Sequence, residues 1–165
     1  MLKIILPVFA GMFLVTSCNT SVPCANQYIT PAFIGFKLSD LDSITVRRFK
    51  KDGAFLQLID TATISLDTNF LKSTSTNDTT FVKLNSISGQ EKYVFPDHDW
   101  QIYIPAKNMT FSISNIISPQ TESSCFKCSC WNPINSFVQN SQTLIPQLRK
   151  IPSLGGDFYI TYIRR

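Results

Sequence analysis

The sequence predicts an all-β fold, namely an antiparallel β-sandwich, with a small β-barrel as the alternative. Three observations favour this class: short runs of alternating apolar residues, frequent turn residues between the runs, and a composition rich in strand formers, including 13 Phe. Long apolar patterns at helical spacing are absent. Roughly eight to ten short strands without a fixed repeat fit two packed sheets, of which the immunoglobulin-like arrangement is one form.

The N-terminal segment has the features of an export signal with a lipid-attachment site. A basic start at Lys3 leads into an almost wholly apolar run over 4–15. This run is shorter than the roughly 20 residues of a membrane-spanning helix and fits the core of a signal peptide. It ends in Val15-Thr-Ser-Cys18, which resembles the lipobox of bacterial lipoproteins. The resemblance implies cleavage before Cys18 and lipidation of its sulfur. An ordinary signal peptide followed by an unrelated cysteine is the alternative.

The chain is predicted to have three parts: a lipoprotein signal peptide (1–17), a lipid-anchored tether (18–27) and a single β-sandwich domain (28–165). A domain of this length can bury a proper core. The net charge of +4 is too small to predict nucleic-acid binding. Bacteroidota lipoproteins on the cell surface often carry acidic residues after the lipidated cysteine, and Asn19-Thr-Ser-Val-Pro23 has none. By comparison with those lipoproteins, the missing acidic residues imply a cell-envelope protein that is anchored in the outer membrane and faces the periplasm.

Four further cysteines, Cys24, Cys125, Cys128 and Cys130, predict two disulfides, because an even number is typical of exported chains. A Cys128–Cys130 bond would close a very small ring, so Cys24 is expected to bond within the late cluster. The favoured pairing is Cys125–Cys130 with Cys24–Cys128. A zinc site of four thiolates is the competing interpretation. Cysteine ligands of zinc are usually spaced as two separate pairs, whereas here three cysteines lie within six residues and Cys24 is remote. An oxidising compartment also disfavours a zinc site.

The first half of the domain is predicted to form short strands separated by turns. Pro31 interrupts the first strand, over 28–36, and suits an edge strand or a bulge. The clearest early strand is 42–49, and it ends in a turn at Lys50-Lys-Asp-Gly53 in which Gly53 supplies the positive φ. Further extended runs are expected at 55–59, 61–66, 79–84 and 92–95, and the Ser- and Thr-rich segment 69–78 is expected to be a loop.

The second half contains the clearest hairpin of the sequence. Trp100-Gln-Ile-Tyr-Ile104 alternates, Pro105 to Asn108 turns the chain, and a second strand is expected over 109–117. Later strands are expected at 134–138 and 158–163. Between them, residues 144–151 carry apolar side chains at helical spacing, with Pro146 early enough for a first turn. One or two helical turns are therefore expected there.

Several phrases resemble the sequences of small Bacteroidota lipoproteins: Ile29-Thr-Pro-Ala-Phe-Ile-Gly-Phe36, Asp99-Trp-Gln-Ile-Tyr-Ile-Pro105 and Phe158-Tyr-Ile-Thr-Tyr-Ile-Arg164. None of these phrases carries a chemical mechanism. The tripeptides Asp42-Ser-Ile, Asp60-Thr-Ala and Asp78-Thr-Thr resemble the O-glycosylation signal of the same phylum. The resemblance implies Ser43, Thr61 and Thr79 as acceptor residues, while Asp-Ser and Asp-Thr also occur commonly in turns.

No motif in the sequence predicts catalysis. The single histidine, His98, lies in Pro96-Asp-His-Asp99 and is expected to belong to a polar turn before the Trp100 strand, with a metal ligand or base as the alternative. Nucleophile-elbow, zinc-protease, phosphate-loop and dinucleotide motifs are absent, and a glycosidase would depend on aspartates because Glu91 and Glu122 are the only glutamates. We therefore expect a protein that is not an enzyme, without cofactor or metal.

Two groups of residues are candidates for a binding surface. The basic run contributes Arg47, Arg48, Lys50 and Lys51, which suit lipid headgroups, lipopolysaccharide or an acidic partner, or simply solvated charge at a strand end. The phenols of Tyr103, Tyr159 and Tyr162 suit an exposed contact. The leading hypothesis is a lipid-anchored envelope protein that binds or scaffolds another envelope protein. The alternative is a small-ligand or glycan binder with an aromatic-lined β face.

Overall fold

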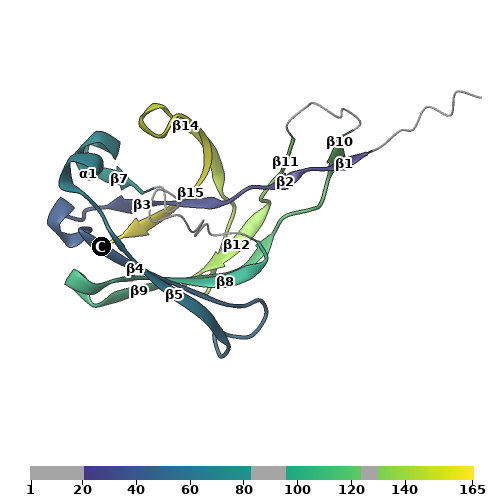
Figure 1. Cartoon of the computed structure of the whole chain (residues 1–165), viewed down its shortest axis with the longest axis horizontal. Coiled ribbons are helices and arrows are strands. Elements are labelled where there is room, and N and C mark those ends of the chain that lie inside the picture. Colours follow the sequence, from purple (N-terminus) through teal and green to yellow (C-terminus); the bar gives the residue numbers. More distant parts are fainter. Residues whose placement is uncertain (1–20, 83–95, 124–129) are drawn as a thin grey trace, which may run out of the picture.

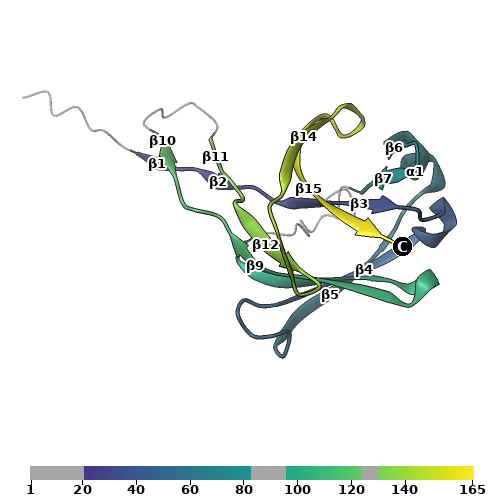
Figure 2. The same ribbon diagram turned by 180° about the vertical axis from the view of Figure 1, so that it is seen from behind.

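The body of the molecule consists of two β-sheets packed face to face, from one end of which a narrow stalk extends (Figure 1). The computed structural model describes residues 21–82, 96–123 and 130–165. The stalk carries the N-terminal strands, whereas the C-terminus lies at the opposite end of the body. Figure 2 shows the same arrangement from behind. The predicted all-β sandwich is confirmed, while the immunoglobulin-like form stays a prediction.

The first sheet has six strands, each antiparallel to its neighbours. In spatial order they are β13 (Gln142–Leu144), β12 (Ser136–Gln139), β9 (Met109–Ile117), β8 (His98–Ile104), β4 (Ser43–Lys50) and β5 (Leu58–Ser65). The predicted hairpin over 100–117 is confirmed as β8 and β9, joined by a short 3-10 helix η2 (Pro105–Lys107) and by Asn108 in the left-handed conformation.

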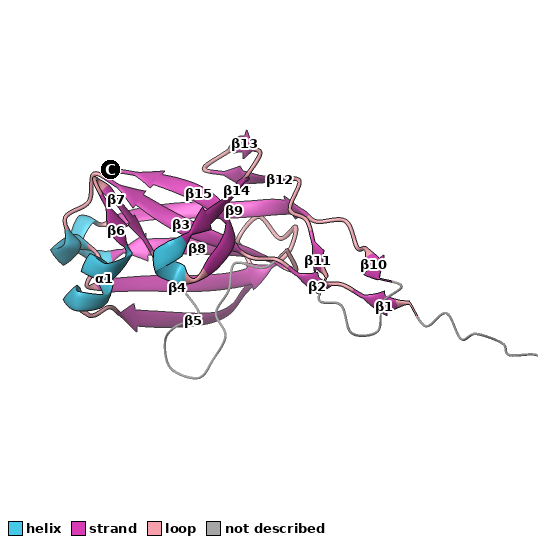
Figure 3. Cartoon of the chain, turned by 90° about the horizontal axis from the view of Figure 1, so that it is seen from above, coloured by secondary structure: helices cyan, strands magenta, loops and turns pink. Residues whose placement is uncertain are grey.

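The second sheet has five strands and is mixed. In spatial order they are β14 (Gln147–Ile151), β15 (Gly156–Arg164), β3 (Ile29–Ile34), β7 (Thr79–Phe81) and β6 (Ser75–Thr76). β15 runs parallel to β3, so the last strand of the chain lies beside the first strand of the body. Figure 3 shows the two layers from above.

Pro31 does not mark an edge strand or a bulge, because β3 is the middle strand of the second sheet. The ladder to β7 pairs Ala32–Ile34, so Pro31 lies at its end. There the Pro31 carbonyl accepts the Val82 N–H at 3.1 Å. The missing N–H of Pro31 therefore costs at most one bond at the end of a ladder.

The main core fills the space between the sheets. Alternating side chains of β8 and β9 point inward, and Trp100, Ile102, Ile104 and Ile113 are almost completely buried there. Phe33 on β3 and Phe137 on β12 complete the centre of this core. Full burial of each large apolar side chain contributes about 1.5–3 kcal/mol. A second, smaller cluster gathers around Ala32, Ile151, Phe158 and Ile160.

The predicted helix and one predicted loop are wrong. Residues 144–151 form the end of β13 and all of β14, because β14 pairs residue by residue with β15 from Gln147 to Ile151. The predicted loop over 69–78 instead contains helix α1 (Thr68–Thr74), followed by β6. The Asp67 side chain caps α1 by accepting the Asn69 N–H, and Leu71 is fully buried in the main core. Two further 3-10 helices are η1 (Leu38–Asp40) and η3 (Pro152–Leu154).

The turn between β4 and β5 also differs from its prediction. The end of the expected run at 55–59 and nearly all of the run at 61–66 form one strand, β5 (Leu58–Ser65), whereas residues 55–57 belong to the turn. Positive φ occurs at Asp52, Ala54 and Phe55 rather than at Gly53. Glycine is favoured at position 53 for a steric reason, because a Cβ there would lie 3.1 Å from the Lys50 carbonyl oxygen. Packing of the Phe55 ring against Phe49, with centroids 5.4 Å apart, holds the left-handed residue in place.

The stalk consists of two short ladders. β1 (Val22–Pro23) pairs antiparallel with β10 (Glu122–Ser123), and β2 (Ala25–Asn26) pairs parallel with β11 (Trp131–Asn132). The C-terminal part of the predicted tether is thus paired with a segment from late in the chain. Predicted extended residues 92–95 and the late part of 79–84 lie outside the described residues.

Candidate functional site

A disulfide joins the two strand pairs of the stalk. Cys24, between β1 and β2, bonds to Cys130, directly before β11, with a Cα–Cα distance of 4.9 Å. The expected bond from Cys24 to the late cluster is confirmed, but the favoured partner Cys128 and the favoured Cys125–Cys130 bond are wrong. Pairing of β2 with β11 brings Cys130 next to Cys24, and its carbonyl accepts the Ala25 N–H at 3.1 Å. Cys125 and Cys128 lie outside the described residues.

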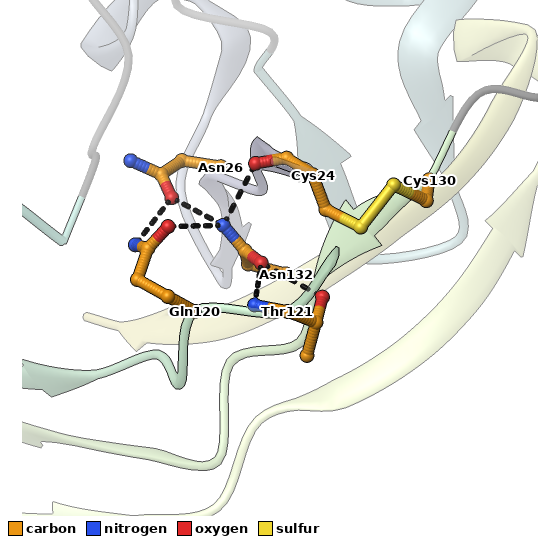
Figure 4. Close-up of a disulfide and its surroundings, with 6 residues drawn as sticks. All are labelled: Cys24, Asn26, Gln120, Thr121, Cys130 and Asn132. Atoms are coloured by element: carbon orange, nitrogen blue, oxygen red, sulfur yellow. Dashed lines mark hydrogen bonds between the residues drawn. A yellow bond between two sulfur atoms is a disulfide. The ribbon is translucent and has the colours of Figure 1, made fainter. Parts of the chain in front are cut away.

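Asn132 organises the stalk beside this disulfide (Figure 4). Its side chain is fully buried, and its Nδ2 donates to the Cys24 carbonyl at 3.0 Å and to Asn26 Oδ1 at 2.8 Å. Its Oδ1 accepts both the backbone N–H and the hydroxyl of Thr121, at 2.8 and 2.9 Å. Gln120 Oε1 is a further acceptor of Nδ2, at 3.0 Å. One amide thus connects β11 both to the N-terminal residues 24–26 and to the segment 120–121.

An open hollow of about 570 Å³ lies where the stalk joins the body. We call it the aromatic groove. Its lining residues come from the segment just before β3, from the stalk and the residues that follow it, and from β14–β15: Gln27, Tyr28, Cys130, Trp131, Pro133, Leu148, Asp157, Phe158 and Tyr159. This volume lies within the range of sites that hold small molecules or peptide side chains.

Two apolar side chains of the groove are exposed to solvent. Trp131 is 53% exposed and Leu148 is 56% exposed. Behind them Phe158 is buried, and its ring lies 6.0 Å from that of Tyr28 at an interplanar angle of 56°. Trp131 directly follows the disulfide-bonded Cys130, so the covalent link restricts the position of its backbone. The groove therefore offers a preformed apolar surface on a braced support.

The groove has few polar groups. Gln27 contributes an amide, and the exposed Asp157 contributes a carboxylate opposite Lys150 in the β14–β15 ladder. Such a surface can stack on planar or apolar groups and orient them with a small number of hydrogen bonds. Trp and Tyr are also the side chains most enriched in energetically important positions of protein interfaces.

His98 and Asp99 lie elsewhere, and not in the polar turn that was expected. Both belong to β8, opposite Lys50 and Phe49 of β4. Desolvation lowers the pKa of His98, and the nearby Arg48 guanidinium lowers it further. Burial raises the pKa of Asp99, against hydrogen bonds from the backbone N–H groups of Asn115 and Asp52. Among described residues, no three His, Cys, Asp or Glu side chains converge in a way that could hold a metal ion.

The predicted binding residues are divided among separate places. Tyr159 lines the aromatic groove, whereas Tyr162 on the same strand lies 5.7 Å from the Arg149 guanidinium outside the groove. Tyr103 belongs to the other sheet, with the Arg47 guanidinium 5.3 Å from its ring. The structure therefore does not bring the three tyrosines together.

The basic run follows the end of β4 and the turn beyond it. Arg47 and Arg48 are partly buried, and Arg48 forms an ion pair with Asp60 at 2.9 Å. Lys50 and Lys51 are exposed at the turn. Of the four residues of the run, these two lysines are the exposed ones, and Lys51 Nζ donates a long hydrogen bond of 3.4 Å to the Ile116 carbonyl.

The glycosylation candidates differ in exposure. Thr61 is exposed on β5, whereas Ser43 and Thr79 are partly buried in β4 and β7. Cys18, the lipidation candidate, lies outside the described residues. No helix in the described part of the chain is long and apolar enough to cross a membrane.

Sequence reasoning missed most of the groove. Trp131 lies in the stalk strand β11 and Leu148 in the body strand β14, and the helix predicted over 144–151 does not place Leu148 beside Trp131. The available signal was Trp131 itself, a large apolar residue beside a cysteine in a polar segment. Comparison of the chain with protein-family models, with curated proteins and with solved structures found no match.

Proposed function

We propose that this protein is a lipid-anchored, non-enzymatic protein of the bacterial cell envelope that binds another envelope protein through the aromatic groove. The observation that carries the proposal is the pair of exposed apolar side chains, Trp131 and Leu148, over a preformed hollow. Burial of these side chains by a partner would contribute a favourable free energy of about 25 cal/mol for each Å² of apolar surface removed from water.

The site of lipid attachment in this proposal is Cys18, at the outer membrane and on its periplasmic side. Its support is the lipobox-like segment and the stalk, which begins a few residues after Cys18 at one end of the body. The disulfide and the Asn132 network stiffen the support of the groove. A stiff support reduces the loss of conformational entropy on binding, and this favours the complex.

The partner segment that fits best is an extended, apolar or aromatic peptide. β14 forms one edge of the second sheet among the described strands, and residues Gln147–Lys150 are exposed along it. A peptide strand added to this edge would place side chains beside Leu148 and into the groove. The same edge also presents Arg149 and Lys150, which suits a segment with some acidic residues.

The test is crosslinked capture from intact envelopes of cells that produce the full chain. With the Trp131→Ala and Leu148→Ala changes combined, we expect recovery of the partner to fall at least about tenfold, as for a central hot spot. The matched control is Ile145→Ala, because Ile145 is 81% exposed but does not line the groove. Equal recovery with the groove variant and the control would refute the assignment of the groove.

A glycan is the second candidate ligand of the groove, because Trp131, Tyr28 and Tyr159 offer ring faces next to the Gln27 amide and the Asp157 carboxylate. Sugar rings stack on such faces and donate hydroxyl hydrogen bonds to such groups. Soluble peptidoglycan and lipopolysaccharide fragments would be titrated into the protein by calorimetry. Heat that disappears in Trp131→Ala and in Gln27→Ala would favour the glycan over the protein partner.

A further inference from the structure

The hairpin between β4 and β5 ends in an exposed apolar tip. Leu56 is 85% exposed, Leu58 55% and Ile59 47%. Single exposed apolar residues are common on protein surfaces, but three within such a short stretch are unusual. Phe55 and Phe49 pack beneath them with ring centroids 5.4 Å apart, so the tip has its own apolar base. We call residues 50–59 the hairpin tip.

The tip also carries the two outward-facing cations of the basic run. Lys50 and Lys51 are exposed, and Lys51 Nζ makes only a long contact of 3.4 Å to the Ile116 carbonyl. Arg48 is committed to Asp60, and Arg47 lies over Tyr103. The neighbouring Asp52 offsets part of the lysine charge, so charge alone cannot hold the tip on a surface.

The position of the tip in the molecule matters as much as its composition. β4 runs toward the end of the body from which the stalk extends, and β5 returns from there. α1 and the C-terminus lie at the opposite end. A chain tethered through a residue just before β1 therefore holds the hairpin tip, rather than α1, on the side of its anchor.

We propose that the hairpin tip docks on the anionic headgroups and outer acyl region of the membrane that holds the anchor. Leu56 and Leu58 enter the interface, and Lys50 and Lys51 contact lipid phosphates, as in other surface-bound elements that join an apolar and a basic face. The molecule is then attached at two points and lies tilted, so the orientation of the aromatic groove relative to the membrane is restricted. This inference rests on the lipid anchoring proposed above.

The test uses the full-length, membrane-processed protein in vesicles of phosphatidylcholine alone or with about 30% phosphatidylglycerol, a level that gives an anionic surface. Leu56→Trp places a fluorophore in the tip, and bromine-labelled acyl chains quench a tryptophan that reaches them. The matched control is Ala106→Trp in η2, which is exposed at the other end of the same sheet. The parent chain, with Trp100 and Trp131, supplies the background.

We expect quenching and a blue shift for Leu56→Trp in anionic vesicles and neither change for Ala106→Trp. Adding Lys50→Gln and Lys51→Gln should lower the ratio of docked to undocked tips about fivefold for each lysine. The same substitutions at the exposed Lys37 and Lys72, near η1 and α1, should leave it unchanged. Protein that floats with the vesicles but shows no added quenching at Leu56→Trp would overturn tip docking alone. Protein that does not float would overturn the anchor and, with it, the two-point attachment.

Discussion

The side chain of Asn132 donates a hydrogen bond of 3.0 Å to the carbonyl of Cys24 across 108 positions of the chain. The same amide accepts two hydrogen bonds from Thr121. A buried amide with all its partners satisfied is favourable, whereas loss of that amide leaves several buried groups without partners. Asn132 therefore determines how the N-terminal strands join the rest of the stalk.

Replacement of Asn132 with Ala should destabilise the stalk by about 2–3 kcal/mol, because the Cys24 carbonyl and the Thr121 N–H lose their partner in a buried place. Hydrogen exchange of the Cys24 and Ala25 amides measures this effect directly. The control is Asn135→Ala, because Asn135 is exposed. In this variant the Cys24 and Ala25 amides should exchange as slowly as they do in the parent. Unchanged exchange in Asn132→Ala would contradict the role of the network.

Peptide mapping under non-reducing conditions should identify a Cys24–Cys130 link. The bond closes a loop with a sequence separation of 106 residues, so Cys24→Ser should cost about 2–5 kcal/mol in the free energy of unfolding. Chemical denaturation in the oxidised and reduced states measures this cost. A peptide that links Cys24 to Cys128 would contradict the Cys24–Cys130 bond. Cys24→Ser is also the control for reduction, because it already lacks this bond and reduction can remove no stability that depends on it.

The Asp99→Asn variant should be more stable than the parent at pH 7. Burial raises the pKa of the Asp99 carboxyl in the folded state above its ordinary value of 3.8, so Asp99 favours folding when protonated. This contribution is complete below the ordinary value and is lost as the pH rises through the raised pKa. Thermal unfolding as a function of pH should show a gain in Tm that disappears in acid.

The control for this change is Asp97→Asn, because Asp97 is exposed two positions away. It should leave the pH dependence of Tm close to that of the parent. A gain in Tm for Asp99→Asn that is equal at acid and neutral pH would show that packing, rather than the buried charge, accounts for it.

The ion pair of Asp40 and Lys107, at 2.9 Å, joins η1 to η2 at the end of the body opposite the stalk. The hydrogen bond from Lys107 lowers the pKa of the Asp40 carboxyl below its ordinary value of 3.8. The stability that it contributes is therefore present above that value and lost as the pH falls through the lowered pKa. Lys107→Gln should lower Tm at pH 7 and reduce the acid sensitivity of Tm, which calorimetry at several pH values measures.

A matched change for this pair is Lys72→Gln, which removes an exposed lysine of α1 for which the structure shows no ion pair among described residues. Its Tm should stay close to that of the parent across the same range. An equal fall of Tm in both variants would point to overall charge and would contradict a specific role of the pair.

The sequence alone determined the local features of the fold, because alternation along a strand depends only on neighbouring residues. The hairpin from Trp100 onward and the final strand from Phe158 followed from that alternation. The bond from Cys24 to the late cysteines followed from their number. Residues 144–151 did not follow, since their helical spacing was overridden by pairing of β14 with β15.

Only the tertiary structure decided which distant segments meet. Helix α1 is stabilised because Leu71 is buried in the main core, which is formed mostly by side chains from the strands. No local pattern in residues 68–74 shows this burial. Cys130, rather than Cys128, bonds to Cys24 because β11 pairs with β2. Trp131 reaches the groove because β11 pairs with the remote β2. Leu148 belongs to the local hairpin of β14 and β15, and that hairpin lies at the groove because β15 pairs with the remote β3. Strand pairing and burial are non-local interactions, and the candidate site exists only where they bring the chain together.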